Sequence, residues 1–117
     1  MIKEVILMIM MTGGEGAVDA SFIGVETLGE CEERAARAIA VFPQAGINYR
    51  GHHCVSSAIK FDDFLHNPEP TGPKYIFDLA FSRDGKQLVA AKLYGSLKEC
   101  EDTGAKNCVI AYQNIQP

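Results

Sequence analysis

The sequence lacks the features that mark nucleic-acid-binding and membrane proteins. Its eleven Lys and Arg residues are scattered among fifteen Asp and Glu residues, and the net charge is −4. A surface for nucleic acid needs concentrated positive charge to attract the phosphate backbone, so we expect no nucleic acid partner. The apolar run from Val5 to Met11 is far too short to span a bilayer, so we expect no membrane partner either.

Recognisable catalytic and cofactor motifs are also missing. None of the four cysteines forms a C-x-x-C pair, which removes the usual redox and zinc-ribbon arrangements. The segment TGGEG, Thr12 to Gly16, lacks the Lys of a phosphate loop and joins two apolar segments instead of opening a helix. No strand-turn-helix elbow presents Ser56 or Ser57 as a nucleophile. We therefore name no catalytic residue and favour a protein that is not an enzyme.

What the sequence does contain is enough apolar residues for one folded domain. The chain has 117 residues, 47% of them apolar and 22% charged. These proportions are typical of a globular protein, and the length corresponds to a single cooperative unit.

Two similar stretches indicate an internal repeat. SLKECED, Ser96 to Asp102, resembles TLGECEE, Thr27 to Glu33, and the similarity extends on both sides. Each half has two apolar segments joined by a turn, then the similar stretch, then a Cys-Val pair. We predict a first repeat over residues 1–57, a linker over 58–74 that contains three prolines, and a second repeat over 75–117.

Local signals predict the elements of each repeat. Asp84-Gly85 favours a type I′ turn and therefore a hairpin between Tyr75 and Tyr94. The capping-box pattern S/T-x-x-E predicts that helices begin at Leu28 and Leu97. The Cys-Val pairs, at Cys54 and Cys108, are predicted to open the last strand of each repeat.

These elements predict an α+β fold made by tandem duplication of a ββαβ unit. We expect antiparallel sheets of about six strands in total, with one helix per half on one face. VILMIMM, Val5 to Met11, is apolar at every position, as is typical of a central strand that is covered on both faces.

The four cysteines occupy matching positions in the two halves. The economical pairing joins Cys31 to Cys54 and Cys100 to Cys108, each helix to the strand that follows it. Such bonds favour a periplasmic or secreted protein. Four reduced, buried cysteines are the alternative, and they would be consistent with a cytoplasmic protein whose N-terminal apolar run is a strand retained in the fold. The same run, following Lys3, also resembles a short signal peptide, although Glu4 and Glu15 count against that interpretation.

The histidines form the one cluster in which we predict a site. YRGHHC, Tyr49 to Cys54, has no counterpart in the second half, and His66 follows nearby. A transition-metal site built from His52 or His53 with His66 and Asp62 is conceivable. Neighbouring strand residues point to opposite faces, however, so His52 and His53 cannot both reach one ion without a bulge.

Three functional hypotheses follow from these observations. The first is a small binding, regulatory or assembly protein that acts through its surface, with a protein partner or by forming a homodimer, and needs no cofactor. The second is a metal-dependent protein or enzyme that uses His52, His53 and His66. The third and weakest is a thiol-disulfide protein.

Overall fold

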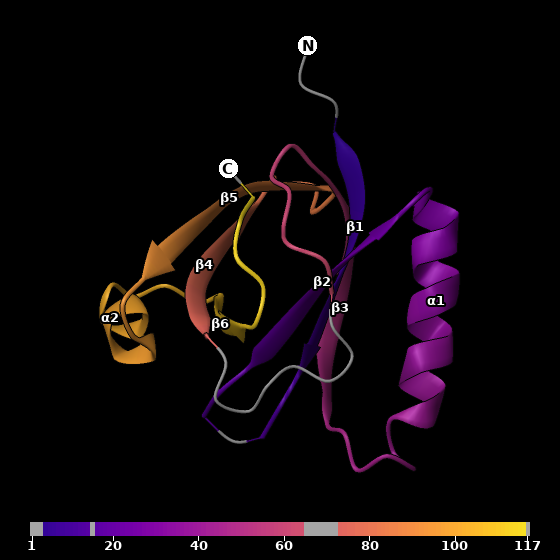
Figure 1. Ribbon diagram of the computed structural model, residues 1–117, viewed down its shortest axis with the longest axis horizontal. Coiled ribbons are helices and arrows are strands. Elements are labelled where there is room, and N and C mark those ends of the chain that lie inside the picture. The colour runs from indigo at the N-terminus through magenta and orange to yellow at the C-terminus, as the bar shows by residue number, and fades with distance from the viewer. Residues whose placement is uncertain (1–3, 15, 65–72, 117) are drawn as a thin grey trace.

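The protein forms one closed, mixed β-sheet with two helices on its outside, an α+β fold. The computed structural model describes residues 4–14, 16–64 and 73–116. Its elements are β1 (Val5–Thr12), β2 (Asp19–Val25), α1 (Leu28–Val41), β3 (Tyr49–Ser57), β4 (Tyr75–Phe81), β5 (Gln87–Tyr94), α2 (Leu97–Asp102) and β6 (Cys108–Ala111). Both helices lie outside the closed sheet, on opposite sides of the molecule (Figure 1).

Each half of the chain forms a three-stranded antiparallel unit. β1 pairs antiparallel with both β2 and β3, and β4 pairs antiparallel with both β5 and β6. The first strand of each half is therefore central.

Neither of the two helices in the described residues has the length and apolar character of a membrane span.

The prediction of a purely antiparallel sheet is wrong, because the halves join through parallel pairs. The full order is β1-β2-β6-β4-β5-β3, closed by the β3–β1 pair. β2 runs parallel to β6 at Asp19–Ala20, and β3 runs parallel to β5 at Ser56–Ser57. Each half alone would leave two unpaired strand edges. Joining the halves at these two short seams pairs parts of all four edges.

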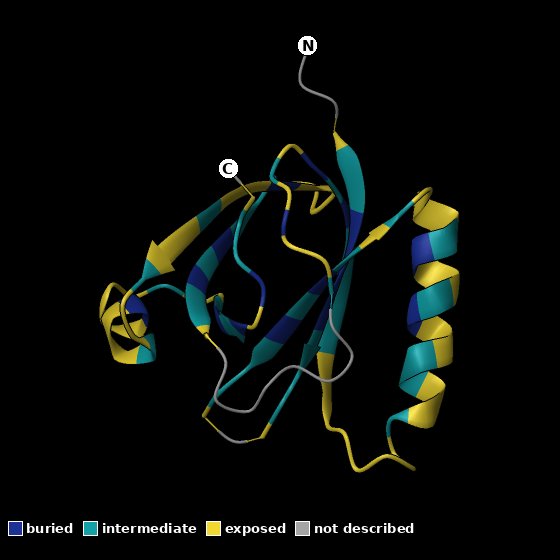
Figure 2. Ribbon diagram, viewed as in Figure 1, coloured by how far each residue is buried: buried dark blue, intermediate teal, exposed yellow. Residues whose placement is uncertain are grey.

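Two separate cores result from this closure. The larger core fills the inside of the barrel and includes Leu7, Ile9, Phe22, Phe77 and Leu79. The smaller core lies outside the sheet under α1, where Met8 and Met10 pack against Cys31 and Ala35. Figure 2 shows the buried residues of α1 on the side that faces the strands. β1 is thus covered on both faces, as its uniform apolarity predicts.

The capping prediction is confirmed for both helices. Thr27 Oγ1 accepts a hydrogen bond from the amide of Glu30 at 3.0 Å, and Ser96 Oγ accepts one from the amide of Glu99 at 3.1 Å. Each glutamate reaches one residue further back than in a standard capping box, because the Glu30 carboxylate accepts from Glu26 N, before α1, and the Glu99 carboxylate accepts from Gly95 N, before α2. The two helix starts are therefore built alike.

The hairpin between β4 and β5 forms, but its turn is not type I′. That turn requires positive φ at both central residues, and only Gly85 has it, at +74°. Asp84 instead accepts hydrogen bonds from Ser82 Oγ at 2.6 Å and from the amide of Lys86 at 3.0 Å. These bonds stabilise a loop that is longer than a two-residue turn. The hydrogen bond from Ser82 N to Gln87 O, at 2.9 Å, closes this loop.

β3 is longer than its sequence pattern predicts. It begins at Tyr49, five residues before Cys54, because it pairs with β1 along almost the whole length of that strand. β6 begins at Cys108 as expected. The predicted linker over residues 58–74 is described at both ends, whereas 65–72, including His66, lie outside the described residues.

Candidate functional site

The first half of the chain carries a disulfide between α1 and β3. Cys31, in the first turn of α1, is joined to Cys54 with a Cα–Cα distance of 5.9 Å. Cys31 is fully buried and Cys54 is half-buried. In the second half Cys100 of α2 is joined to Cys108 of β6, with a Cα–Cα distance of 6.1 Å. Each bond therefore fastens a helix to the outer surface of the barrel.

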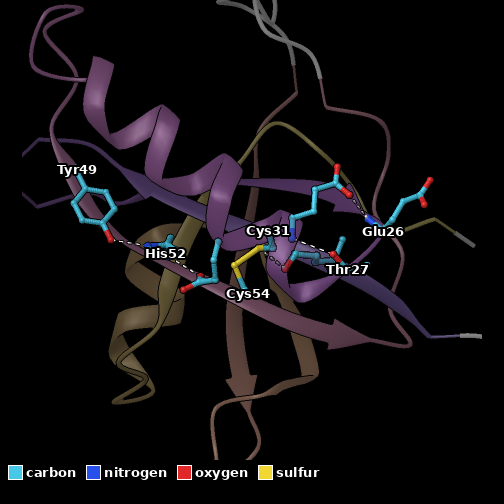
Figure 3. The surroundings of a disulfide bond; sticks show 9 residues. Glu26, Thr27, Cys31, Tyr49, His52 and Cys54 are labelled. Atoms are coloured by element: carbon cyan, nitrogen blue, oxygen red, sulfur yellow. Dashed lines mark hydrogen bonds and ion pairs between the residues drawn. A yellow bond between two sulfur atoms is a disulfide. The ribbon is translucent and has the colours of Figure 1, made fainter.

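His52 links this disulfide region to Tyr49. Its Nε2 lies 3.1 Å from Glu32 Oε1, and its Nδ1 lies 2.7 Å from the Tyr49 hydroxyl. Figure 3 shows His52 between Tyr49 and the Cys31–Cys54 bond. The side chain of Glu32 comes from the exposed side of α1, and those of His52 and Tyr49 come from the outer face of β3. They form a continuous hydrogen-bonded chain beside the disulfide.

His53 lies on the opposite face of β3 from His52. Its ring stacks on Phe81 with a centroid distance of 4.2 Å. Desolvation by burial, followed by repulsion from His52, lowers the pKa of His53 below its ordinary value of 6.5. His53 therefore packs against an aromatic side chain in surroundings that disfavour its charged form.

The other two predicted metal ligands, Asp62 and His66, belong to the stretch of chain that follows β3. Asp62 lies in the segment after β3, where its amide donates to Asn114 O at 2.8 Å. Its carboxylate accepts from Asn114 N at 3.3 Å. His66 lies outside the described residues. The metal site predicted from His52 or His53, Asp62 and His66 stays a prediction.

A groove runs between α1 and β2, and we call it the α1–β2 groove. Its volume is about 470 Å³. Apolar side chains from both sides form most of its lining: Met8, Met10, Ile23, Ala38, Phe42 and Ile47. Phe64 and Tyr112 contribute aromatic rings, and Arg34 and Asp19 are its two ionisable groups other than the Tyr112 phenol.

Arg34 is held only weakly by other residues of the described part of the chain. Its one ion-pair contact there is with Glu30, at 3.9 Å between Nη1 and Oε1, and both side chains are 40% exposed. At this length and exposure an ion pair contributes little to stability. The guanidinium is therefore free to bind an anionic group in the groove.

Sequence reasoning missed the groove and the role of Glu32. Glu32 carries no sequence signal beyond that of a solvated helix residue, because its contact with His52 depends on how α1 packs on β3. The groove depends in the same way on how α1 packs beside β1 and β2. Helical periodicity correctly places Cys31 and Ala35 on the buried face.

Comparison with known proteins adds no relative to this description. The chain matches no protein-family model, no curated protein and no solved structure. The site itself must therefore carry the functional argument.

Proposed function

We propose that this protein is a small, non-enzymatic binding protein that recognises a partner protein through the α1–β2 groove. The observation that carries this proposal is the composition of the groove, an apolar cleft of about 470 Å³ with one loosely held guanidinium at its side. Ligand sites commonly combine an apolar lining with a few polar groups that fix orientation.

The occupant that fits this chemistry is a peptide segment with an apolar side chain next to a carboxylate. Ile23, Phe42 and Ile47 supply partly exposed apolar surface for the apolar side chain, and the buried Met8 and Met10 also line the groove. Arg34 would bind the carboxylate through paired hydrogen bonds. Asp19, which lines the same groove, disfavours a second negative charge near it.

Binding of short labelled peptides, followed by fluorescence polarisation, tests this proposal. The probes share a Leu-Leu pair and differ in the next residue, which is Glu, Gln or Lys. We expect the Glu peptide to bind best. We expect Ala38→Trp, which fills the groove, to abolish binding, and Arg34→Gln to weaken the Glu peptide about tenfold, equivalent to about 1.4 kcal/mol, and to remove the preference for Glu.

Matched controls lie on the same helix. Ala40→Trp and Arg37→Gln make the same changes at exposed positions of α1 outside the groove lining, and both should bind like the wild type. Equal binding by all four variants, or no binding of any peptide by the wild type, would contradict the proposal.

A homodimer is not needed to cover the apolar strand Val5 to Met11. α1 together with the barrel interior supplies that cover within one chain. A heterologous partner is therefore the form of the proposal that we retain. Sedimentation of the protein at increasing concentration measures its oligomeric state, and a stable dimer would favour the homodimer instead.

We also propose that the two halves arose by duplication of one ββαβ unit. Supporting this are the identical element order, the matching disulfides and the two helix caps of the same construction. The two seams support it as well, because an equivalent backbone hydrogen bond forms at each. Ser56 N donates to Lys86 O at 2.9 Å, and Ile110 N donates to Val18 O at 2.8 Å. An experimental structure in which the halves differ in strand order or disulfide pairing would contradict the duplication.

The disulfides bear on where the protein works. Two intact bonds in a chain of this size favour an oxidising compartment, periplasmic or extracellular. Thiol labelling of the native protein from its natural source tests this proposal. Labelling of all four cysteines without prior reduction would indicate a reducing compartment instead.

A further inference from the structure

The Cys31–Cys54 disulfide differs from its counterpart in having metal-ligand side chains around it. The two sulfur atoms and a carboxylate oxygen of Glu32 all lie within 4.8 Å of one another. Glu32 in turn contacts His52 Nε2 at 3.1 Å. Among residues 4–14, 16–64 and 73–116, no other group of three such ligands is this compact, and the Cys100–Cys108 bond has no third ligand of this kind.

These residue types are those that Zn²⁺ selects. Thiolate sulfur, imidazole nitrogen and carboxylate oxygen are its ordinary protein ligands, usually four in a tetrahedral arrangement. While the sulfurs are bonded to each other they carry no thiolate charge, so the oxidised protein offers only Glu32 and His52. Reduction would supply the two missing ligands.

We propose that reduction of the Cys31–Cys54 disulfide creates a zinc site with Cys31, Cys54, Glu32 and His52 as its ligands. A dithiol reductant transfers two electrons and two protons to the disulfide and is itself oxidised to a disulfide. Zn²⁺ then displaces the two thiol protons to solvent and binds both thiolates. The covalent link between α1 and β3 is replaced by a coordinated one.

The two sulfurs can reach the spacing of zinc ligands by side-chain rotation. Two sulfurs on a tetrahedral Zn²⁺ lie about 3.8 Å apart, given bonds of about 2.3 Å. The Cα atoms of Cys31 and Cys54, 5.9 Å apart, allow this separation once the S–S bond is broken and the side chains rotate. An ion can enter from the side of Glu32, whose side chain is 65% exposed, and Cys54 and His52 are half-buried beside it.

Tyr49 completes the site as a positioning residue. Its hydroxyl is 2.7 Å from His52 Nδ1. With the proton on Nδ1 donated to this hydroxyl, Nε2 presents its lone pair toward Glu32. A metal-bound histidine typically has such a partner on its other nitrogen, which fixes the tautomer and orients the ring.

Zinc uptake by the full chain in two redox states tests the proposal. The protein is exposed to Zn²⁺ alone, before and after reduction with a metal-free phosphine, desalted, and measured by elemental analysis. We expect one zinc per chain after reduction and none before. Alkylation followed by peptide mass spectrometry should find Cys31 and Cys54 protected by zinc and Cys100 and Cys108 modified. Zinc without protection of Cys31 and Cys54 would overturn the assignment.

Variants separate these ligands from their neighbours. We expect His52→Ala and Glu32→Gln to weaken zinc binding by the reduced chain at least about tenfold, and Tyr49→Phe to weaken it about tenfold. His53→Phe, on the other face of β3, and Glu33→Gln, next to Glu32, should bind like the wild type. Equal loss in the controls would overturn the site. Substitution with Co²⁺ gives a second readout, a thiolate charge-transfer band that only the reduced wild type and the controls should show at full intensity.

Circular dichroism of the reduced chain covers the case in which reduction unfolds the protein. A spectrum that is native-like with zinc supports the proposal whether or not the metal-free chain is folded. A reduced chain that remains unfolded in excess zinc, or that folds but takes up none, overturns it.

Discussion

Gln113 pairs with Phe22 in the way that a strand residue would. Its side-chain oxygen accepts from the amide of Phe22 at 2.9 Å, and its side-chain nitrogen donates to the carbonyl of Phe22 at 2.7 Å. The same nitrogen donates to Asp62 O at 2.6 Å. The ladder between β2 and β6 covers only two residue pairs, and Gln113, which is 4% exposed, extends it and ties in the segment that follows β3.

We expect Gln113→Leu to lower the free energy of unfolding by about 2 to 3 kcal/mol. The substitution keeps the size of the side chain but replaces its amide with an apolar group, which leaves buried backbone groups of Phe22 without partners and is therefore costly. Urea denaturation measures the effect. Gln87→Leu, at an exposed position of β5, is the matched control and should change stability by less than about 0.5 kcal/mol. A similar small change for Gln113→Leu would show that this side chain does not hold the seam.

The two disulfides should contribute unequally to stability. They close loops with sequence separations of 23 and 8 residues, and the entropy lost by the unfolded chain grows with loop length. We expect removal of the first bond, by Cys31→Ala with Cys54→Ala, to cost about 3.5 kcal/mol and removal of the second, by Cys100→Ala with Cys108→Ala, about 2.5 kcal/mol. Chemical denaturation of the two double variants without zinc tests this ranking. A larger cost for the second bond would contradict it.

Loss of a helix cap should destabilise the protein modestly. Thr27→Ala removes the hydroxyl that accepts from Glu30 N, and we expect a loss of about 1 kcal/mol in thermal or urea denaturation. Thr27→Ser keeps the hydroxyl and should restore most of this stability. Equal losses for Ala and Ser would mean that the methyl group, and not the hydrogen bond, is the part of Thr27 that matters.

Stability should fall in mild acid because of His53. Its pKa is lowered in the folded state by burial and by His52, whereas the unfolded value is about 6.5. Below that pH the His53 side chain binds a proton more readily in the unfolded chain than in the folded one. The free energy of unfolding therefore decreases as pH falls from about 6.5 toward the lower folded pKa. We expect His53→Phe, which keeps a ring against Phe81, to reduce the slope of stability between about pH 7 and about pH 5. An unchanged slope in this variant would assign the acid sensitivity to other groups.

Sequence patterns identified most elements because their signals are local. The capping residues Thr27 and Ser96 set the helix starts, and the uniform apolarity from Val5 to Met11 predicted a strand covered on both faces. The start of β3 at Tyr49 escaped the pattern because pairing with β1 extended the strand beyond its apolar part. The turn at Asp84 escaped it because the hydrogen bonds that the Asp84 carboxylate accepts from Ser82 Oγ and from the Lys86 amide outweighed the dipeptide preference.

The candidate site was only partly predictable for the same reason. His52 stood out because the second half has no equivalent, and its separation from His53 followed from strand geometry. Glu32 and Arg34 did not stand out, since a charged residue on a helix is ordinary. Their importance comes from the side chains that α1 meets when it packs, His52 on β3 for Glu32 and the apolar lining of the groove for Arg34.

The sequence by itself determined the order of the elements and the central position of β1, because capping, periodicity and apolar runs act over a few neighbouring residues. Tertiary structure alone decided how the halves meet. Unpaired strand edges have to find partners, and which edges can do so depends on the directions of strands far apart in the chain. The parallel seams at Asp19–Ala20 and Ser56–Ser57 are consequences of that closure. The groove and the contacts of His52 outside the barrel depend on how α1 packs on the sheet.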